Sequence, residues 1–214
     1  MANDDGLSLG KRDLERRFSI LWADVTGGWM SLCTWRVVSD AVDEDRLNPY
    51  NWFLEGVIDG CRREAVMALA RIFDPENHHH DHASLRKLLE VAARNPKEFE
   101  YAPTSEELIE AVEEKKKWIK KHDLARRIRQ LRTKVLAHSD MVGLGDHQAA
   151  SAVHMSVAEV AACYEEIGEV TNVFQAYFKN HLWAEPGSIT AQVTNDFNHL
   201  FKAEMGDYAK WKER

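Results

Sequence analysis

One arginine and one histidine stand six residues apart, as Arg132 and His138, in the segment Leu131-Arg-Thr-Lys-Val-Leu-Ala-His-Ser-Asp140. A guanidinium holds phosphate oxygens through a planar fork of N–H donors, and an imidazole titrates near neutral pH. Such a pair suits RNA cleavage by the neighbouring 2′-hydroxyl. His138 would move a proton on or off the attacking or leaving oxygen, and Arg132 would stabilise the charge that develops on the phosphoryl group. This chemistry needs no metal ion, and we expect neither a metal nor another cofactor.

The spacing of this pair is weak evidence when it is taken alone. With 15 arginines and 10 histidines in 214 residues, about two Arg-x(4–6)-His matches are expected by chance. Two are found, because Arg71 and His78 match as well. The residues around each pair must therefore show which match is functional and which arose by chance.

The helical register places both groups of the first pair near an apolar seam. On an ideal helix Arg132 lies at one edge of this seam and His138 lies on or near it. Both side chains are therefore expected to face a packing partner. That position suits a cleft between two subunits, and it equally suits a histidine that caps a helix end within the core. Asp140 is a lesser candidate that could orient the imidazole. The seam consists of Leu124, Ile128, Leu131 and Val135.

Positive charge is concentrated around this motif, although the whole chain has a net charge of −7. Residues 115–134 contain ten Lys or Arg against the single carboxylate of Asp123, and the rest of the chain is strongly acidic. Such a helix can contact a phosphate backbone locally while the acidic body resists nonspecific coating. The alternative is a solvated helix face that only keeps the protein in solution. The supporting RNA contacts that we expect are Lys134, Arg126, Arg127 and Arg129.

The overall composition is that of an ordinary globular protein, with 44% hydrophobic and 29% charged residues. No apolar run approaches the roughly 18 residues that span a bilayer, and the first residues are acidic rather than basic and apolar. We therefore expect a cytoplasmic protein without membrane contact. The three cysteines are far apart and form no CxxC pair, so they are interpreted as buried thiols.

A histidine-rich tract, His78-His79-His80-Asp81-His82, is the one segment that invites a metal interpretation. Adjacent residues of a loop seldom converge on a single ion, and no second ligand cluster with motif spacing accompanies the tract. We interpret it as a solvated, mobile loop.

Helical periodicity dominates the chain, which predicts an all-α bundle that forms one domain over residues 1–214, with its core at about 52–178. An N-terminal helical region is expected over 9–42, with Gly27-Gly28 as a kink or break. A core helix is expected over 52–73 and a short helix from Ser84 to the residue before Asn95-Pro96. Thr104 with Glu107 opens one long helix that carries both the basic stretch and the motif. Ser156 with Glu159 opens a helix that reaches Phe178, and a weakly patterned C-terminal helix follows at about 189–212.

Two segments resemble the HEPN superfamily. Residues 131–140 resemble its signature, in which Arg, a polar residue and Lys precede an Ala-His pair at a helix end. Residues 59–74, followed by Ser84-Leu-Arg-Lys-Leu-Leu89, are similar to the helix-loop-helix entry of the abortive-infection AbiU-like branch. The resemblance covers roughly 52–178 and implies a HEPN-like bundle of long antiparallel helices with helical additions at the termini. One departure is Thr133, where the family often has Asn or Asp.

The resemblance also implies a function. The superfamily includes metal-independent ribonucleases of toxin–antitoxin and phage-defence systems, whose sites usually form where two subunits bring their motifs together. It therefore implies an endoribonuclease with Arg132 and His138 as catalytic residues at a homodimer interface, acting on RNA and paired with a protein antitoxin. The alternative is a non-catalytic member that binds RNA or nucleotides. A purely structural interaction protein remains a third class.

Overall fold

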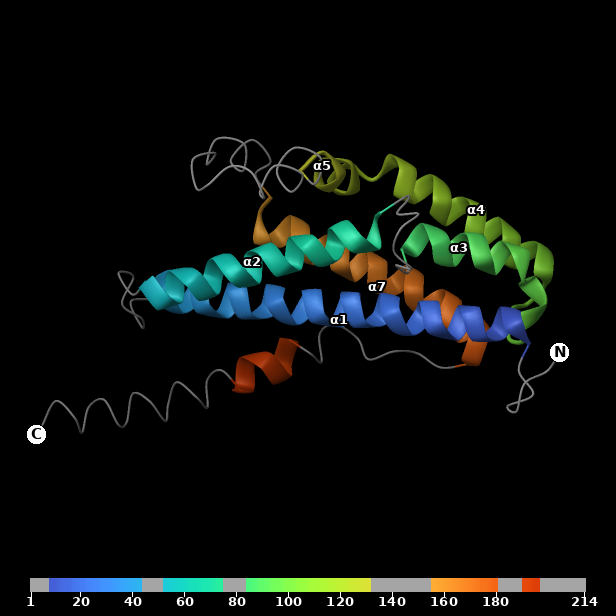
Figure 1. Cartoon of the computed structure of the whole chain (residues 1–214), viewed down its shortest axis with the longest axis horizontal. Coiled ribbons are helices and arrows are strands. Elements are labelled where there is room, and N and C mark those ends of the chain that lie inside the picture. Colours follow the sequence, from blue (N-terminus) through green and yellow to red (C-terminus); the bar gives the residue numbers. More distant parts are fainter. Residues whose placement is uncertain (1–7, 44–51, 75–83, 132–154, 181–189, 197–214) are drawn as a thin grey trace, which may run out of the picture.

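The computed structural model describes residues 8–43, 52–74, 84–131, 155–180 and 190–196, and every regular element within them is helical (Figure 1). The expected all-α class is confirmed. A short helical segment covers residues 190–196, and the rest of the predicted C-terminal helix lies outside the described residues. The remaining elements are α1 (Leu9–Asp43), α2 (Trp52–Ile72), α3 (Leu85–Arg94), the 3-10 turn η1 (Pro96–Glu98), α4 (Ser105–Lys121), α5 (Asp123–Leu131) and α7 (Val157–Lys179).

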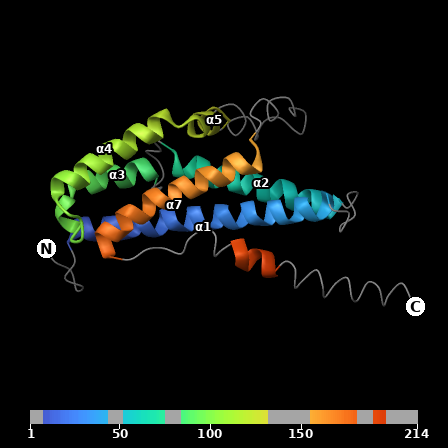
Figure 2. The same cartoon turned by 180° about the vertical axis from the view of Figure 1, so that it is seen from behind.

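Three long helices form the body of the molecule. α2 and α7 both run antiparallel to α1 and lie beside it, and Figure 2 shows the same arrangement from behind. α3 and α4 form an antiparallel pair near the N-terminal end of α1, where Lys11 pairs with Glu100 at 2.9 Å. α5 then contacts α2 and α7 at the other end of α4. None of the described helices is both long and apolar enough to cross a membrane.

α1 lies within the core rather than beside it. Its buried side chains recur every three or four residues, which draws one apolar stripe along a 35-residue helix. This stripe joins the buried residues of α2, α3, α4, α5 and α7 in one apolar cluster. The core therefore includes the N-terminal helical region and is wider than the range 52–178. The stripe consists of Leu14, Phe18, Leu21, Val25, Trp29 and Leu32.

Gly27-Gly28 does not break α1, contrary to the prediction of a kink or break. A Cβ at Gly28 would lie 1.8 Å from Oη of Tyr164 and 2.7 Å from Cβ of Ala68, whereas nothing lies within 4 Å at Gly27. Gly28 thus lets α1 approach α2 and α7 closely. In the same place the Tyr164 hydroxyl donates a hydrogen bond of 2.7 Å to the Ala65 carbonyl.

Three predicted helix starts are confirmed by their caps. The Ser84 and Thr104 hydroxyls accept hydrogen bonds from the backbone N–H three residues later, at 3.2 and 3.1 Å. Ser156 and Glu159 form a complete capping box at the start of α7. Because each cap satisfies a backbone donor that the helix itself leaves unpaired, it fixes the residue at which the helix begins.

The prediction of one long helix from Thr104 is wrong, because the helix is interrupted at His122. α4 ends at Lys121 and α5 begins at Asp123. The backbone of His122 is extended, with φ −66° and ψ 117°, and its ring accepts a hydrogen bond from the N–H of Ala125. The neighbouring charges suit this division. Lys120 and Lys121 lie in the last turn of α4 and Asp123 lies in the first turn of α5, where each complements the local helix dipole.

The predictions for α2 and the thiols hold in part. The buried residues of α2 all lie in its second half, whereas its first turn is largely open to solvent and Trp52 is 81% exposed. Cys33 and Cys163 are buried as expected, whereas Cys61 is half-buried. No group of three metal-ligating side chains gathers within the described residues, and the His78–His82 tract lies outside them.

Candidate functional site

The motif segment follows the described part of α5. Leu131 is the last residue of α5 that the structure describes, and Arg132 follows it in the chain. Arg126, Arg127 and Arg129 lie on α5 itself. The side chain of Arg129 is outside the described part of the structure. The same holds for four whole residues of the predicted site, namely Arg132, Lys134, His138 and Asp140.

An ion pair joins the two helices that flank the motif segment. Nη1 of Arg127 on α5 lies 2.8 Å from Oε1 of Glu159 in the first turn of α7. Oε2 of Glu159 also accepts hydrogen bonds from the backbone N–H and the hydroxyl of Ser156, at 2.8 and 3.0 Å. The bond from Arg127, followed by the two from Ser156, lowers the pKa of Glu159 to about 2. The ion pair therefore holds the middle of α5 against the first turn of α7.

The other described arginine of α5 is more accessible. Arg126 is exposed, and its partner is Asp123 three residues earlier on the same helix. The hydrogen bond from Arg126 lowers the pKa of the Asp123 carboxyl. Because exposed pairs within one helix contribute little stability, the guanidinium of Arg126 can exchange this partner for a phosphate at low cost. Arg127 is half-buried and held by Glu159, so it is a poorer phosphate ligand.

The basic stretch continues backward along α4. Lys115 and Lys116 pair with Glu114 and Glu113, at 3.1 and 2.8 Å. The hydrogen bond from Lys116 lowers the pKa of Glu113. The lysines closest to α5 are different, because they are exposed and form no ion pair with another described residue. This open basic surface consists of Lys117, Lys120 and Lys121.

His122 occupies the junction between α4 and α5, and it was not among the site residues predicted from the sequence. Its Nδ1 accepts the Ala125 N–H at 3.3 Å, so Nε2 carries the ring proton and donates to Oε2 of Glu166 at 3.0 Å. The ring stacks on Phe73 with a centroid distance of 5.6 Å and meets the edge of Trp118 at 4.9 Å. A histidine beside a carboxylate suits proton transfer, but both nitrogens of this ring are already used within the fold. The available signal was the charge reversal Lys-Lys-His-Asp at 120–123.

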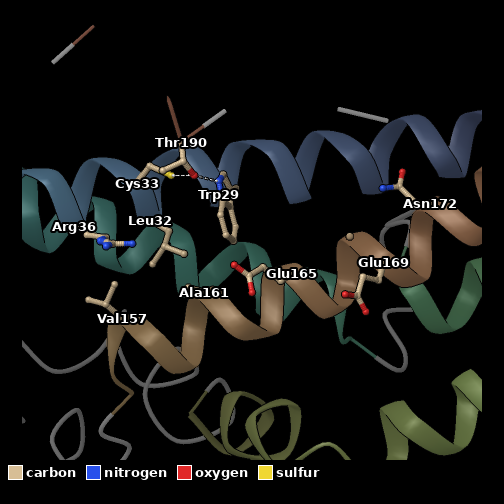
Figure 3. Close-up of a pocket in the computed structure, with 11 residues that line it drawn as sticks. Trp29, Leu32, Cys33, Arg36, Val157, Ala161, Glu165, Glu169, Asn172 and Thr190 are labelled. Atoms are coloured by element: carbon tan, nitrogen blue, oxygen red, sulfur yellow. Dashed lines mark hydrogen bonds between the residues drawn. The ribbon is translucent and has the colours of Figure 1, made fainter. Parts of the chain in front are cut away.

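A groove between α1 and α7 lies apart from this region (Figure 3). It has a volume of about 530 Å³ and is lined by Trp29, Cys33, Glu165 and Glu169 among others. At its edge Trp29 Nε1 donates a hydrogen bond of 3.0 Å to the Thr190 hydroxyl. At about 100° per residue, Glu165 and Glu169 face a different side of α7 from the residues that contact α5. The groove therefore does not belong to the motif region.

The described elements form an all-α bundle, and the comparison with family models gives the class of the protein. The family model HEPN_AbiU2, described as AbiU2, matches residues 11–201, so the chain belongs to the AbiU2 family of HEPN proteins. The resemblance to the AbiU-like branch of the HEPN superfamily is thereby confirmed, and the match extends beyond 52–178 at both ends. Neither a curated protein nor a solved structure matches the chain.

Proposed function

We propose that this AbiU2-family protein is a metal-independent endoribonuclease of the abortive-infection or toxin–antitoxin type, with Arg132 and His138 as its catalytic residues. The observation that carries the proposal is the motif itself, which stands in a chain of HEPN family membership and comes directly after the described part of α5. The second Arg-x(4–6)-His match lacks this context. Arg71 is bound to Asp24 and Glu64, at 2.7 Å each, inside the helical body.

The reaction uses the RNA's own nucleophile. The 2′-hydroxyl oxygen bonds to the adjacent phosphorus as the bond from phosphorus to the 5′-oxygen breaks, which leaves a 2′,3′-cyclic phosphate and a 5′-hydroxyl. The proton leaves the 2′-oxygen and a proton reaches the departing 5′-oxygen, and the His138 imidazole carries one of these transfers. The Arg132 guanidinium stabilises the negative charge on the phosphoryl oxygens in the transition state.

The basic surface of α4 and α5 supports an RNA substrate. Lys117, Lys120 and Lys121 are exposed, and Arg126 follows them toward the end of α5. A phosphate backbone held along this surface would lead toward the motif. The subunit arrangement that we propose is a C2 homodimer that brings two motifs together, because isologous pairing places the same segment of both chains at one interface.

The experiment that tests the proposal is cleavage of a mixed RNA pool in EDTA. Wild type, His138→Ala, Arg132→Ala and the matched control His78→Ala are purified identically, and circular dichroism confirms that each is folded. We expect wild type and His78→Ala to produce cyclic-phosphate ends, and the two motif variants to lose at least about 100-fold in rate. Light scattering of the same samples gives the subunit number. A monomer that still cleaves RNA refutes the dimeric site.

Non-catalytic RNA binding is the second candidate, and the open lysines of α4 favour it. In that case no variant cleaves RNA, and the wild type still binds it with an affinity that falls steeply as salt rises. A charge-reversal variant at Lys120 weakens this binding, whereas reversal at the paired Lys115 weakens it less.

Expression in cells gives a second test of the ribonuclease proposal. Expression of wild type is expected to arrest growth, and expression of His138→Ala is not. Co-expression of a neighbouring antitoxin relieves the arrest.

A further inference from the structure

A single side chain holds the turn from α4 into α5. The His122 ring accepts the Ala125 N–H of α5, donates to Glu166 of α7, and stacks on Phe73 at the end of α2. Its side chain is 14% exposed. Three helices that are far apart in the sequence therefore meet at one imidazole, and each of its two nitrogens has a separate task. Nδ1 caps α5, and Nε2 ties the cap to α7.

α5 depends on such contacts for its position. Its described part has nine residues, and an isolated helix of that length is unstable in water. Leu124, Ala125 and Ile128 bury its apolar face, and the pair of Arg127 with Glu159 holds its middle. His122 adds the contact at its first turn. The apolar face limits rotation about the helix axis, while the two polar contacts with α7 fix the direction of the axis.

The direction of α5 sets the position of its last described residue, Leu131. From Asp123 to Leu131 the helix rises about 12 Å at about 1.5 Å per residue, so a tilt of about 10° moves Leu131 by about 2 Å. Arg132 is the next residue in the chain. In enzymes generally, a misplacement of about 1 Å can reduce the rate about 100-fold. A small change at the first turn is thus amplified at the point where the chain enters the motif.

We propose that His122 is a positioning residue for the Arg132 and His138 pair, acting through α5 without touching RNA; the proposal rests on the ribonuclease function above. Histidine is suited to this position because it reaches both partners from one rigid ring. Asparagine offers an acceptor at the place of Nδ1 but is too short for Glu166. Glutamine reaches Glu166 but does not cap a helix well, because side-chain caps favour short residues.

The test compares His122→Ala, His122→Asn and His122→Gln with wild type. Steady-state cleavage of RNA gives kcat and KM, at a temperature at which thermal melting shows each variant to be folded. Amide hydrogen exchange measures the opening of α5 at Ala125 to Ile128 without reference to activity. We expect His122→Ala to lower kcat by at least about 10-fold with little change in KM, because the RNA-binding lysines of α4 are untouched. Exchange in α5 should accelerate in the same variant.

His122→Gln decides between positioning and general stability. If the tie to Glu166 of α7 sets the helix direction, this variant recovers most of the lost kcat, although it loses the ring stacking on Phe73. His122→Asn, which restores the cap but not the tie to Glu166, recovers less. If kcat in all three variants instead follows the melting temperature, or if folded His122→Ala has wild-type kcat, the inference is overturned. Should His122→Ala fail to fold, the comparison of Asn with Gln gives the same decision.

The exchange measurement separates this inference from the proposed function. If wild type does not cleave RNA, the ribonuclease proposal fails and the positioning role fails with it, whereas faster exchange in His122→Ala still shows that the ring holds α5. If wild type cleaves RNA but α5 exchange is the same in wild type and His122→Ala, the ribonuclease proposal stands and the positioning inference fails.

Discussion

Replacing Gly28 by alanine tests the close packing of α1 against α2 and α7. The new methyl group would lie 1.8 Å from the Tyr164 hydroxyl oxygen and 2.7 Å from Cβ of Ala68. Neither distance is tolerable, so the helices must separate or the Tyr164 ring must move. Gly28 is buried and Tyr164 is fully buried, which leaves little free space for such a movement.

The expected cost has three parts. Alanine favours a helix over glycine by about 1 kcal/mol, which alone would stabilise the protein. Against this gain, overpacking of a core costs about 1–3 kcal/mol. Displacement of Tyr164 breaks its hydrogen bond of 2.7 Å to the Ala65 carbonyl, and leaving those buried groups unsatisfied costs about 1–3 kcal/mol more. We therefore expect a net destabilisation of about 3 kcal/mol.

Gly27 is the matched control for this change. It lies in the same helix one residue earlier, is exposed, and has nothing within 4 Å of a built Cβ. Gly27→Ala should gain about 1 kcal/mol of unfolding free energy from helix propensity alone. Urea unfolding followed by circular dichroism measures both variants. If Gly28→Ala is as stable as Gly27→Ala, the close approach of the three helices is refuted.

Two further predictions concern charged groups. The pKa of Glu159 is lowered from its ordinary 4.5 to about 2 by Arg127 and by the Ser156 cap. Its contribution to stability is therefore complete above about pH 4.5 and is lost as the pH falls toward 2. In urea unfolding between pH 5 and pH 2.5, Glu159→Gln should show a smaller loss of stability than wild type, and an equal loss contradicts the prediction. Burial lowers the pKa of Arg71, but its hydrogen bonds to Glu64 and Asp24 outweigh burial and raise it. Arg71→Ala should therefore destabilise the fold by about 2 kcal/mol and leave RNA cleavage per folded molecule unchanged. Loss of cleavage by a folded Arg71→Ala protein would contradict the choice of Arg132 and His138, rather than Arg71 and His78, as the catalytic pair.

The fold class and the helix starts were predictable because local chemistry determines them. Apolar residues at three- and four-residue spacing predict the buried face of α7, and Val160, Tyr164 and Phe174 are indeed fully buried. A hydroxyl that can accept a backbone N–H three residues later marks a helix start whatever the helix packs against. Thr104 and Ser156 were identified in this way.

The errors came from contacts between residues that are far apart in the chain. The break at His122 depends on Glu166, 44 residues later, and on the ring of Phe73. The need for glycine at position 28 depends on Tyr164. Periodicity shows that a helix has a buried face, but it does not show which helix covers that face. The same limit explains why α1 was predicted as an addition and lies instead in the core.

The same distinction between local patterns and long-range contacts applies to the candidate site. The motif residues Arg132 and His138 were found from sequence, because family signatures are local and their chemistry follows from residue type. The groups that hold the ends of the motif segment are pairs across helices, such as Arg127 with Glu159, and no local pattern marks them. Recognition from sequence thus proposes the reacting groups, while the structure identifies contacts that hold the helices beside them.

The basic residues of α4 and α5 show why both the sequence and the structure are needed. Counting residues gives ten basic side chains between 115 and 134, which suggests a uniform RNA-binding helix. The structure shows that these side chains differ. Lys115 and Lys116 have carboxylate neighbours in the same helix, and Arg127 is bound to a glutamate whose other oxygen is fixed by a helix cap. An incoming phosphate must compete with these partners, and the competition is hardest at Arg127 because the cap holds Glu159 in place. The number of basic residues therefore sets only an upper limit on phosphate contacts, and their partners within the fold determine which of them are available to RNA.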